Sequence, residues 1–425
     1  MTLKYKNIFL YFLYLIFFQK NIFTQFVPGF GVNGSIIRTA DTLIFNSFAI
    51  ANQNKIVAVG NTLDGVNAII TRYNSDGSVD TTFNNTGYKI ETAANTGTFK
   101  DCIVDNQERI IVIGRNDFAR GLITRYTKEG ALDTTFGTSS GRSILSATGE
   151  FNSCTLTNDG KIIAVSGDTG VPSLIVRYTS EGRADTTFAP SGYINAGTIG
   201  VQALRMCQID KDESIVAVGR TAVNEESGQT EGIIVCYTPA GALDERFNNV
   251  GYLIIPEATE LNGFAFDDEG KIIAVGKNPE QKGIVIRCDL NGLDTSFNST
   301  GYSIIDRDYS VFNSCIVDSQ VGIVAYGTVD INNTTIGLIG YYQLNGQLNS
   351  IISKTGYELI DTFYKITKIS LDSQKRIIMC GAIPTPVRGI IERRLINGKP
   401  DSQENWNYQN LKESCVLLGR RTAIL

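Results

Sequence analysis

The sequence predicts an all-β fold, a seven-bladed β-propeller of four-stranded antiparallel blades. Three observations support this prediction. The tetrapeptide Asp-Thr-Thr-Phe recurs about every 53 residues, a β-branched run ending in glycine recurs in the same phase, and the apolar segments between turns are too short for helices. Four-stranded units of roughly 40 to 55 residues, repeated seven times, are typical of a propeller.

The tetrapeptide fixes the phase of the repeat. Its phenylalanine, or the residue in the equivalent place, recurs with spacings of 53, 53, 52, 59, 50 and 55 residues. The fourth and fifth copies are degenerate, the sixth reads Asn-Ser-Ile-Ile, and the seventh, Asp-Ser-Gln-Glu, loses the phenylalanine. The marker positions are Phe30, Phe83, Phe136, Phe188, Phe247, Phe297 and Ile352.

Within one unit the apolar segments are rich in isoleucine and valine, which favours strands. In the second unit we expect strands at 99–104, 109–114 and 122–127, with an outer strand at 142–145 or its counterpart at 88–91. The β-branched run ending in glycine has seven copies, at 56–60, 110–114, 162–167, 215–219, 272–276, 323–327 and 377–381.

The repeat sorts the loops onto two faces of the ring. The first and third connections of each blade are regular: an Asp-led turn such as 105–108, and the glycine turn before the tetrapeptide, where Asp80 and its equivalents cap the next turn. The glycines of that turn are expected at positive φ, namely Gly77, Gly130, Gly182 and Gly241. The second connections vary, and variable loops on a rigid scaffold are where recognition usually resides. They span 61–67, 115–120, 168–173, 220–231, 277–282, 328–335 and 382–388.

The two ends of the ring are expected to meet. Residues 30–36 match the end of a unit rather than its beginning, so the N-terminus supplies a strand near 34–39 to the last blade. This pairing hides a sheet edge that would otherwise invite aggregation. We therefore assign 26–400 to the propeller and 401–425 to a C-terminal tail, which either adds a strand or cap or is a loose end.

Residues 1–25 have the pattern of an export signal. Lys4 and Lys6 precede an uninterrupted apolar run at 8–18. Those eleven residues, rising about 1.5 Å each, do not cross roughly 30 Å of hydrocarbon. A permanent transmembrane span is therefore the weaker interpretation, and a buried helix is weaker still. We expect an exported protein, periplasmic, on the cell surface or secreted, with no stable transmembrane span.

One stretch of the unit resembles a known repeat. The string Lys-Ile-Ile-Ala-Val-Gly, then Arg-Tyr, then Gly-x-x-Asp-Thr-Thr-Phe-x-x-x-Gly is similar to the delta-60 repeat, a family of predicted bacterial β-propellers. The resemblance covers about residues 26–400 and is closest in the first three units. It implies a propeller and frequent export, and it implies no known reaction.

The composition excludes several functions. Histidine is absent, which removes triads built on His, His-ligated zinc and His-relayed proton transfer. Lys plus Arg number 38 against 43 Asp plus Glu, a net charge of −5 with no basic stripe, so nucleic acid is not expected as a partner. We expect a monomer without a cofactor.

The eight cysteines are expected to be neither disulfide-bonded nor metal-binding. Cys102, Cys154, Cys207 and Cys315 share one inner-strand position, which favours small buried hydrophobes. Equivalent positions in adjacent blades should exceed the roughly 7 Å Cα separation that a disulfide allows. The other four cysteines show no CxxC spacing.

An arginine recurs in the third strand of five units. The simplest interpretation is a structural ladder whose aliphatic stems are buried while the charged heads snorkel to solvent. Its members are Arg72, Arg125, Arg177, Arg287 and Arg393.

Polar residues begin the inner strands and should ring the central channel. They either hold a polar ligand at the channel mouth or, as we favour, satisfy backbone groups between blades or channel water. The candidates are Asn46, Asn152, Asn262 and Asn313, with Lys100, Arg205 and Thr367 in the remaining blades.

The longest variable loop, 220–231, is the second candidate binding region. Its charged candidates are Arg220, Glu225, Glu226 and Glu231. Residues 74–77 with Asp80 resemble part of a calcium loop, but the other units do not repeat the oxygens that calcium requires, so we expect a plain turn.

Function is less constrained than fold. We favour a non-catalytic scaffold that binds an unknown protein or glycan through the variable-loop face. The rival is a hydrolase or lyase acting on a glycan or similar polar substrate with paired carboxylates, drawn from Glu225, Glu231, Glu257 and Asp306. A pair of carboxylates at the channel mouth with one elevated pKa would favour the enzyme, and a shallow, uncharged mouth would favour the scaffold. A large exposed apolar patch would support a third possibility, a structural coat component.

Overall fold

The computed structural model describes residues 30–401, apart from 38–42, 64, 93–96, 169, 172, 227, 362, 364, 385–386 and 396–397. The expected leader at 1–25 and the tail beyond Asp401, with Cys415, lie outside the described residues. Among the residues described, no helix is long and apolar enough to cross a membrane. Short 3-10 turns at Asn52–Asn54 and Ala196–Ile199 interrupt an otherwise all-β chain.

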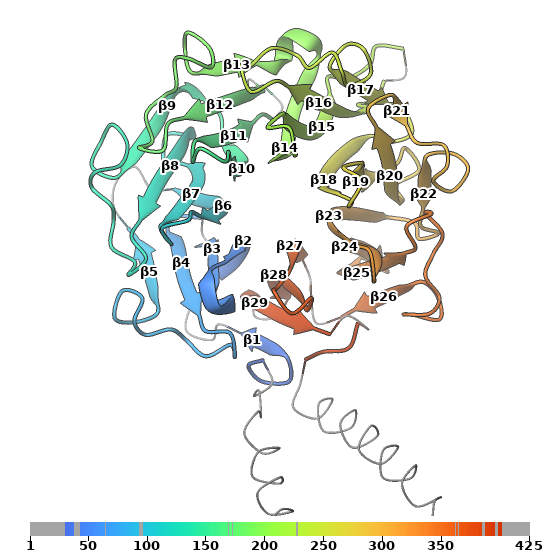
Figure 1. The fold of residues 1–425 in the computed structure, drawn as a ribbon. Helices are drawn as coiled ribbons and strands as arrows, with labels where there is room; N and C mark the ends of the chain where they lie inside the picture. Colours follow the sequence, from blue (N-terminus) through green and yellow to red (C-terminus); the bar gives the residue numbers. More distant parts are fainter. Residues whose placement is uncertain are drawn as a thin grey trace, which may run out of the picture.

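Seven sheets surround a common axis, as the sequence predicted (Figure 1). Blade 1 contains β2 (Leu43–Ile50), β3 (Ile56–Thr62), β4 (Ala68–Tyr73) and β5 (Tyr88–Glu91). Blade 2 contains β6 (Thr98–Val104), β7 (Ile110–Arg115), β8 (Arg120–Tyr126) and β9 (Arg142–Thr148). Blade 3 contains β10 (Phe151–Leu156), β11 (Ile162–Ser166), β12 (Leu174–Tyr178) and β13 (Tyr193–Asn195). Blade 4 contains β14 (Val201–Ile209), β15 (Ile215–Thr221), β16 (Gly232–Tyr237) and β17 (Tyr252–Ile255).

The remaining blades follow the same order from the axis outward. Blade 5 contains β18 (Glu260–Phe266), β19 (Ile272–Lys277) and β20 (Gly283–Asp289), which pairs with both β21 (Gly292–Leu293) and β22 (Tyr302–Ile304). Blade 6 contains β23 (Ser310–Asp318), β24 (Gly322–Ile331), β25 (Thr334–Tyr342) and β26 (Tyr357–Ile360). Blade 7 contains β27 (Lys365–Leu371), β28 (Ile377–Pro384), β29 (Val387–Arg394) and β1 (Ser35–Ile37).

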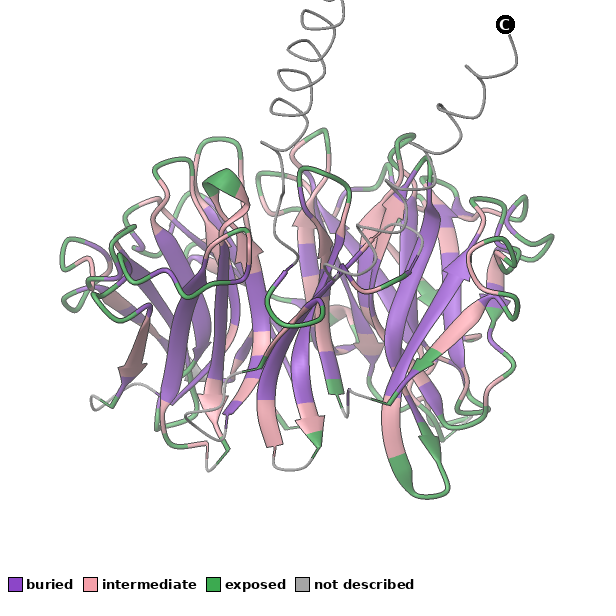
Figure 2. Cartoon of the chain, turned by 90° about the horizontal axis from the view of Figure 1, so that it is seen from below, coloured by how far each residue is buried: buried purple, intermediate pink, exposed green. Residues whose placement is uncertain are grey.

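The core lies between the blades. The β-branched runs of β3 and β7 are buried, and one apolar cluster joins Val57 and Val59 of blade 1 to Phe99 and Val112 of blade 2. Every junction repeats this pattern, so each sheet buries both faces against its neighbours. Figure 2 shows the consequence: buried residues fill the middles of the strands, and exposed residues gather in the loops at the two ends. The strands predicted in the second unit are confirmed, with ends shifted by one to three residues.

The ring closes as predicted. β1 pairs antiparallel with β29 in the register Ser35↔Glu392. Leu43 and Phe45 of blade 1 pack in one cluster with Ile378 and Ile391 of blade 7. The first and last blades therefore form a junction like the other six.

In the five blades that carry the signature arginine, the signature contacts the next blade. In blade 1 the Nε of Arg72 donates to the Asp80 carboxylate at 2.7 Å, and its guanidinium stacks 5.0 Å from the Phe83 centroid. The same guanidinium donates to the backbone carbonyl of Lys128 in blade 2. Gly130 follows there at φ +88°, and a Cβ at this position would lie 2.8 Å from the Phe83 ring. The tetrapeptide phenylalanine is thus enclosed by its own arginine and the glycine turn of the next blade.

The arginine ladder exists, but the predicted snorkelling is wrong. Arg125 and Arg393 are only 3% and 1% exposed, because their guanidinium groups are held by aspartate and by a backbone carbonyl of the following blade. A guanidinium group with this many charged and carbonyl acceptors makes stronger hydrogen bonds at the junction between blades than in solvent. The predicted positive φ at Gly77 and the capping by Asp80 of Thr82 are both confirmed.

Candidate functional site

A β-bulge in the first strand of every blade builds the central channel. In blade 1 the register shifts between Phe45 and Ser47, and the residue between them, Asn46, turns toward the axis. Bulges commonly redirect a side chain in this way. The equivalent bulged residues lining the channel are Lys100, Asn152, Arg205, Asn262, Asn313 and Thr367.

The channel asparagines bond to neighbouring blades. The Asn46 amide donates to the carbonyl of Phe99 at 2.7 Å, one blade further around the ring. The others repeat this contact, so these side chains satisfy backbone carbonyls of neighbouring blades. The bonds are Asn152 to Leu204 at 2.8 Å, Asn262 to Phe312 at 3.1 Å and Asn313 to Ile366 at 3.2 Å, with the Thr367 hydroxyl to Phe45 at 3.0 Å.

An ion pair that the sequence did not reveal crosses the channel wall. The Nζ of Lys368 in blade 7 lies 2.8 Å from Asp101 in blade 2, passing Ser47 of blade 1 at 3.0 Å. Burial alone would lower the pKa of Lys368, but the charge of Asp101 outweighs it and raises the pKa. Asp101 also accepts from the Ser153 hydroxyl and the Cys154 amide, so one carboxylate joins four blades. A signal was present: Asp101 and Lys368 occupy the position after the bulge, where three other blades carry serine.

The channel is small. Its cavity measures ≈ 90 Å³, well below the roughly 300 Å³ at which ligand pockets begin. Asp101 is the one carboxylate among the described residues that line it. The two basic side chains at bulge positions have acidic partners: Glu150 contacts Lys100 at 3.2 Å, and Glu260 contacts Arg205 at 3.8 Å.

The candidate loop 220–231 forms one wall of a pocket on the variable-loop face. Arg220 bridges Asp168 at 3.2 Å and Glu260 at 3.4 Å, which links blades 3, 4 and 5. The pocket beside it measures ≈ 320 Å³ and is lined also by Thr230 and Lys277.

The glutamates of the loop take different positions. Glu225 and Glu226 are exposed and do not line this pocket. Glu231 lies at the base of the loop, where its backbone pairs with Thr221 and its carboxylate accepts from Asn224 at 3.4 Å. Thus Arg220 belongs to a charged cluster, whereas its three acidic neighbours in the sequence are spread along the loop.

The remaining carboxylates considered for catalysis are also placed. Asp306 is fully exposed and contacts Lys282 at 3.1 Å. Glu257 lies in the link between blades 4 and 5, and its buried Oε2 has no hydrogen-bond partner. The backbone bond from Gly232 to Ala258 at 2.7 Å brings the Glu231 and Glu257 segments side by side.

The described cysteines are all free and buried, as predicted. In the described part of the chain no group of three or more Cys, Asp or Glu side chains has the geometry of a metal site. Asp76 accepts from the backbone and hydroxyl of Ser78 at 2.8 and 2.7 Å, so the segment that resembles a calcium loop forms a local turn.

Comparison with known proteins agrees on the architecture alone. The family model described as "Domain of unknown function (DUF5122) beta-propeller" matches residues 54–83, which run from the first turn of blade 1 to Phe83 and make up only part of one repeat. No curated protein matches the sequence.

Several solved structures are similar over most of the chain. A PQQ-bound aldose sugar dehydrogenase from Streptomyces coelicolor is 9% identical with a TM-score of 0.42, over 85% of this chain and 98% of that one. A gluconolactonase from Xanthomonas campestris is 11% identical with a TM-score of 0.39, over 86% and 97%. A protein from Lactobacillus plantarum is 11% identical with a TM-score of 0.45, over 74% and 82%. Likenesses at this level carry no functional argument.

Proposed function

We propose that this protein is a non-catalytic binding scaffold of the delta-60 repeat type, exported as a monomer, whose variable-loop face recognises a protein or glycan. The delta-60 assignment is supported by the repeat string and by the match to a β-propeller model over 54–83. Export is supported by the charged and apolar pattern of residues 1–25.

The state of the channel is the observation that carries the proposal. A propeller enzyme acting at its axis needs open volume and unpaired acid and base groups. Here the cavity is ≈ 90 Å³, the amides of Asn46 and its equivalents are bonded to neighbouring blades, and Asp101 is neutralised by Lys368. The residues at the axis therefore hold the blades together, and this favours the loops as the surface that recognises a ligand.

On the variable-loop face a pocket lies beside Arg220. Its ≈ 320 Å³ lies within the range of ligand pockets. Arg220 is fixed by two carboxylates from neighbouring blades, and Thr230 is fixed by its bond to the Thr259 carbonyl at 2.7 Å. Side chains held in this way present a rigid surface, which lowers the entropic cost of binding.

Shortening the loop tests this proposal. Replacing residues 223–229 by two glycines keeps the backbone pairing of Thr221 with Glu231 and removes the tip. We expect this variant to fold and to lose ligands that the mature chain captures from a protein pull-down and a glycan array. The control replaces residues 330–335 at the tip of the β24–β25 hairpin by two glycines, which keeps the pairing of Val329 with Ile336. Equal capture by all three proteins would refute recognition through loop 220–231.

One observation favours the hydrolase or lyase as a second candidate. Glu257 has a buried, unpartnered carboxylate oxygen beside the segment that carries Glu231, and two neighbouring carboxylates are the usual apparatus of glycoside cleavage. Its test is release of reducing sugar from a polysaccharide panel by the wild type and by Glu257→Gln. Activity that Glu257→Gln abolishes would establish the enzyme and displace the scaffold.

A further inference from the structure

Two pockets of matching composition lie on the regular-turn face, the face that carries the Asp-led and glycine turns. One lies between blades 1 and 2 and measures ≈ 380 Å³; the other lies between blades 3 and 4 and measures ≈ 330 Å³. Each has a lysine and an arginine from the first blade and a glutamate from the next. In the first pocket these are Lys55, Arg72 and Glu108, and in the second they are Lys161, Arg177 and Glu213.

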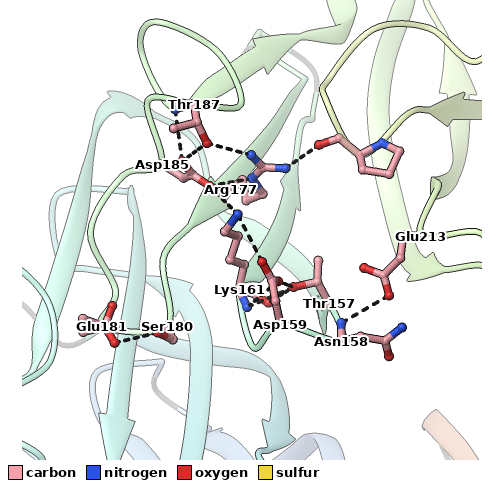
Figure 3. Close-up of polar contacts among 11 residues, drawn as sticks. Thr157, Asn158, Asp159, Lys161, Arg177, Ser180, Glu181, Asp185, Thr187 and Glu213 are labelled. Atoms are coloured by element: carbon pink, nitrogen blue, oxygen red, sulfur yellow. Dashed lines mark hydrogen bonds and ion pairs between the residues drawn. The ribbon is translucent and has the colours of Figure 1, made fainter.

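The polar groups of the second pocket are held in place (Figure 3). Lys161 contacts Asp159 at 3.2 Å and Asp185 at 3.5 Å, and Arg177 donates to Asp185 at 2.8 Å. Across the junction Glu213 reaches from blade 4 to accept from the Asn158 amide at 3.3 Å.

The first pocket repeats this arrangement. Lys55 lies 2.9 Å from Asp80, and Arg72 donates to Asp80 at 2.7 Å and to the Thr82 hydroxyl at 3.1 Å. Lys55 and Lys161 remain 26% and 32% exposed, so each ammonium has donors left for a ligand.

The two glutamates adopt an unfavourable backbone conformation. Glu108 and Glu213 have φ of +61° and +66°, a region that favours glycine or asparagine. At the same turn position blades 3 and 5 carry Gly160 and Gly270. Blade 7 carries Lys375 there at φ +62°, and this lysine pairs with Asp318 of blade 6 at 2.5 Å. A side chain that costs stability at a place where glycine fits indicates a role other than folding.

The complete set of three residues occurs at these two junctions only, within the part of the chain that the structure describes. Elsewhere Gly160, Val321 or Asn54 replaces the glutamate, and Cys236 or Tyr341 replaces the arginine. The other junctions between blades form without this set, so the propeller fold does not require it.

The chemistry of the pockets favours an uncharged ligand. Around the first pocket Lys55, Arg72 and Lys128 are balanced by Asp80, Glu108 and Glu129. Around the second, two cations face three carboxylates, so neither pocket favours an anion; these groups are Lys161, Arg177, Asp159, Asp185 and Glu213. The ligand must offer hydroxyl groups that donate to the glutamate and accept from the lysine.

It must also offer an apolar face. The apolar surface that a ligand can reach is that of half-buried Ala51 in the first pocket and of exposed Pro239 and Ala240 in the second. A pyranose ring combines a C–H face with a rim of hydroxyls. We propose that these two pockets are equivalent binding sites for hexopyranose units of a glycan.

Two sites on one face imply bivalent recognition. Sites with the same orientation relative to the ring axis can engage two residues of one chain or of one decorated surface, and a linked second contact raises overall affinity strongly. This inference is independent of the variable-loop face, because no residue of loop 220–231 lines either pocket.

The test uses the full chain and methyl glycosides of glucose, galactose, mannose, fucose and N-acetylglucosamine. Saturation-transfer NMR should show transfer to ring protons of at least one glycoside, and calorimetry should give two sites per chain. Glu108→Gly and Glu213→Gly should each leave one site, and the double variant should bind at least tenfold more weakly. Glycine relieves the positive φ, so melting temperatures should be equal or higher.

The control is Lys375→Gly, which changes the same turn position at a junction where Tyr341 replaces the arginine, and which should keep two sites. If the double glycine variant fails to fold, the Asn pair Glu108→Asn and Glu213→Asn replaces it, because Asn54 already occupies this conformation. The proposal would be overturned if none of the glycosides bound, or if the double variant bound them as the wild type does. It would also be overturned if betaine or inorganic phosphate bound in their place.

Discussion

The guanidinium of Arg393 lies 4.6 Å from the centroid of the Phe30 ring, and the two residues come from opposite ends of the propeller. Arg393 also donates to Asp401 at 2.7 Å and to the backbone carbonyl of Ser75 in blade 1. The seventh copy of the signature, which lacks its phenylalanine in the sequence, is completed by Phe30. The first residue of the expected tail, Asp401, is part of the same assembly and is 3% exposed.

Replacing Phe30 by alanine should therefore open the ring. We expect the free energy of unfolding to fall by about 3 to 5 kcal/mol, since a fully buried ring and its stacking are lost. Guanidinium titration of the full chain measures this value. Phe83→Ala is the matched control, because Phe83 has the same surroundings in mid-chain. A Phe30 variant as stable as the wild type would show that closure does not depend on this contact.

The signature aspartates should make stability depend on acid. Burial alone would raise the pKa of Asp80, but hydrogen bonds from Thr82, Lys55 and Arg72 outweigh it and hold the pKa well below the ordinary 3.8. For Asp244 the hydrogen bonds of Arg246 lower the pKa to about 2. As the pH falls, these carboxylates take up protons in the unfolded chain before they do so in the folded protein. Their stabilisation of the fold is therefore complete above the ordinary pKa and is lost as the pH falls through the pKa values of the folded state.

Denaturant titrations at pH 7, 5, 4 and 3 measure this dependence. The free energy of unfolding should begin to fall near pH 4 and should drop most between pH 4 and 3. Asp80→Asn should flatten the curve while lowering stability at pH 7 by about 3 kcal/mol. Asp306→Asn, at a fully exposed ion pair, should behave as the wild type does. Parallel curves for Asp80→Asn and the wild type would contradict the assignment.

The Lys368–Asp101 pair in the channel wall should contribute more to stability than ion pairs at the channel mouth. Lys368→Met leaves Asp101, only 9% exposed, without its cation and should cost about 3 kcal/mol. Lys100→Met breaks a pair in which the lysine is 38% exposed and should cost less than about 1 kcal/mol. Thermal or denaturant unfolding ranks the two variants. Adding Asp101→Asn to Lys368→Met should recover part of the loss, and equal costs for the two lysine variants would argue against a cohesive channel.

The buried thiols should be unreactive in the folded protein. Burial raises the pKa of Cys315 and Cys380 to about 12, so little thiolate is present at pH 8. Iodoacetamide followed by peptide mass spectrometry should leave the described cysteines unlabelled until denaturant is added. Cys154→Ala should cost about 1 kcal/mol and leave ligand binding unchanged. Loss of binding with an intact fold would mean that Cys154 does more than fill space.

The sequence predicted what the repeat encodes locally. The strands, the positive φ of Gly77, the cap of Asp80 and the meeting of the chain ends all follow from residues within one unit. The Lys368–Asp101 pair was not predicted, because its two residues belong to blades 7 and 2 and meet only when ring closure places both blades beside blade 1. The inter-blade pockets were missed for a similar reason, since Lys55 and Glu108 face each other only once neighbouring sheets have a fixed angle.

Closure by Phe30 and Asp401 has a consequence for biosynthesis. Until the last blade has been made, Leu43 and Phe45 lack the side chains of blade 7 that cover them, and a nascent chain carries an uncovered apolar sheet at each end. Premature termination at any later blade leaves that surface exposed to chaperones and proteases, so cellular quality control should discriminate sharply between complete and incomplete copies.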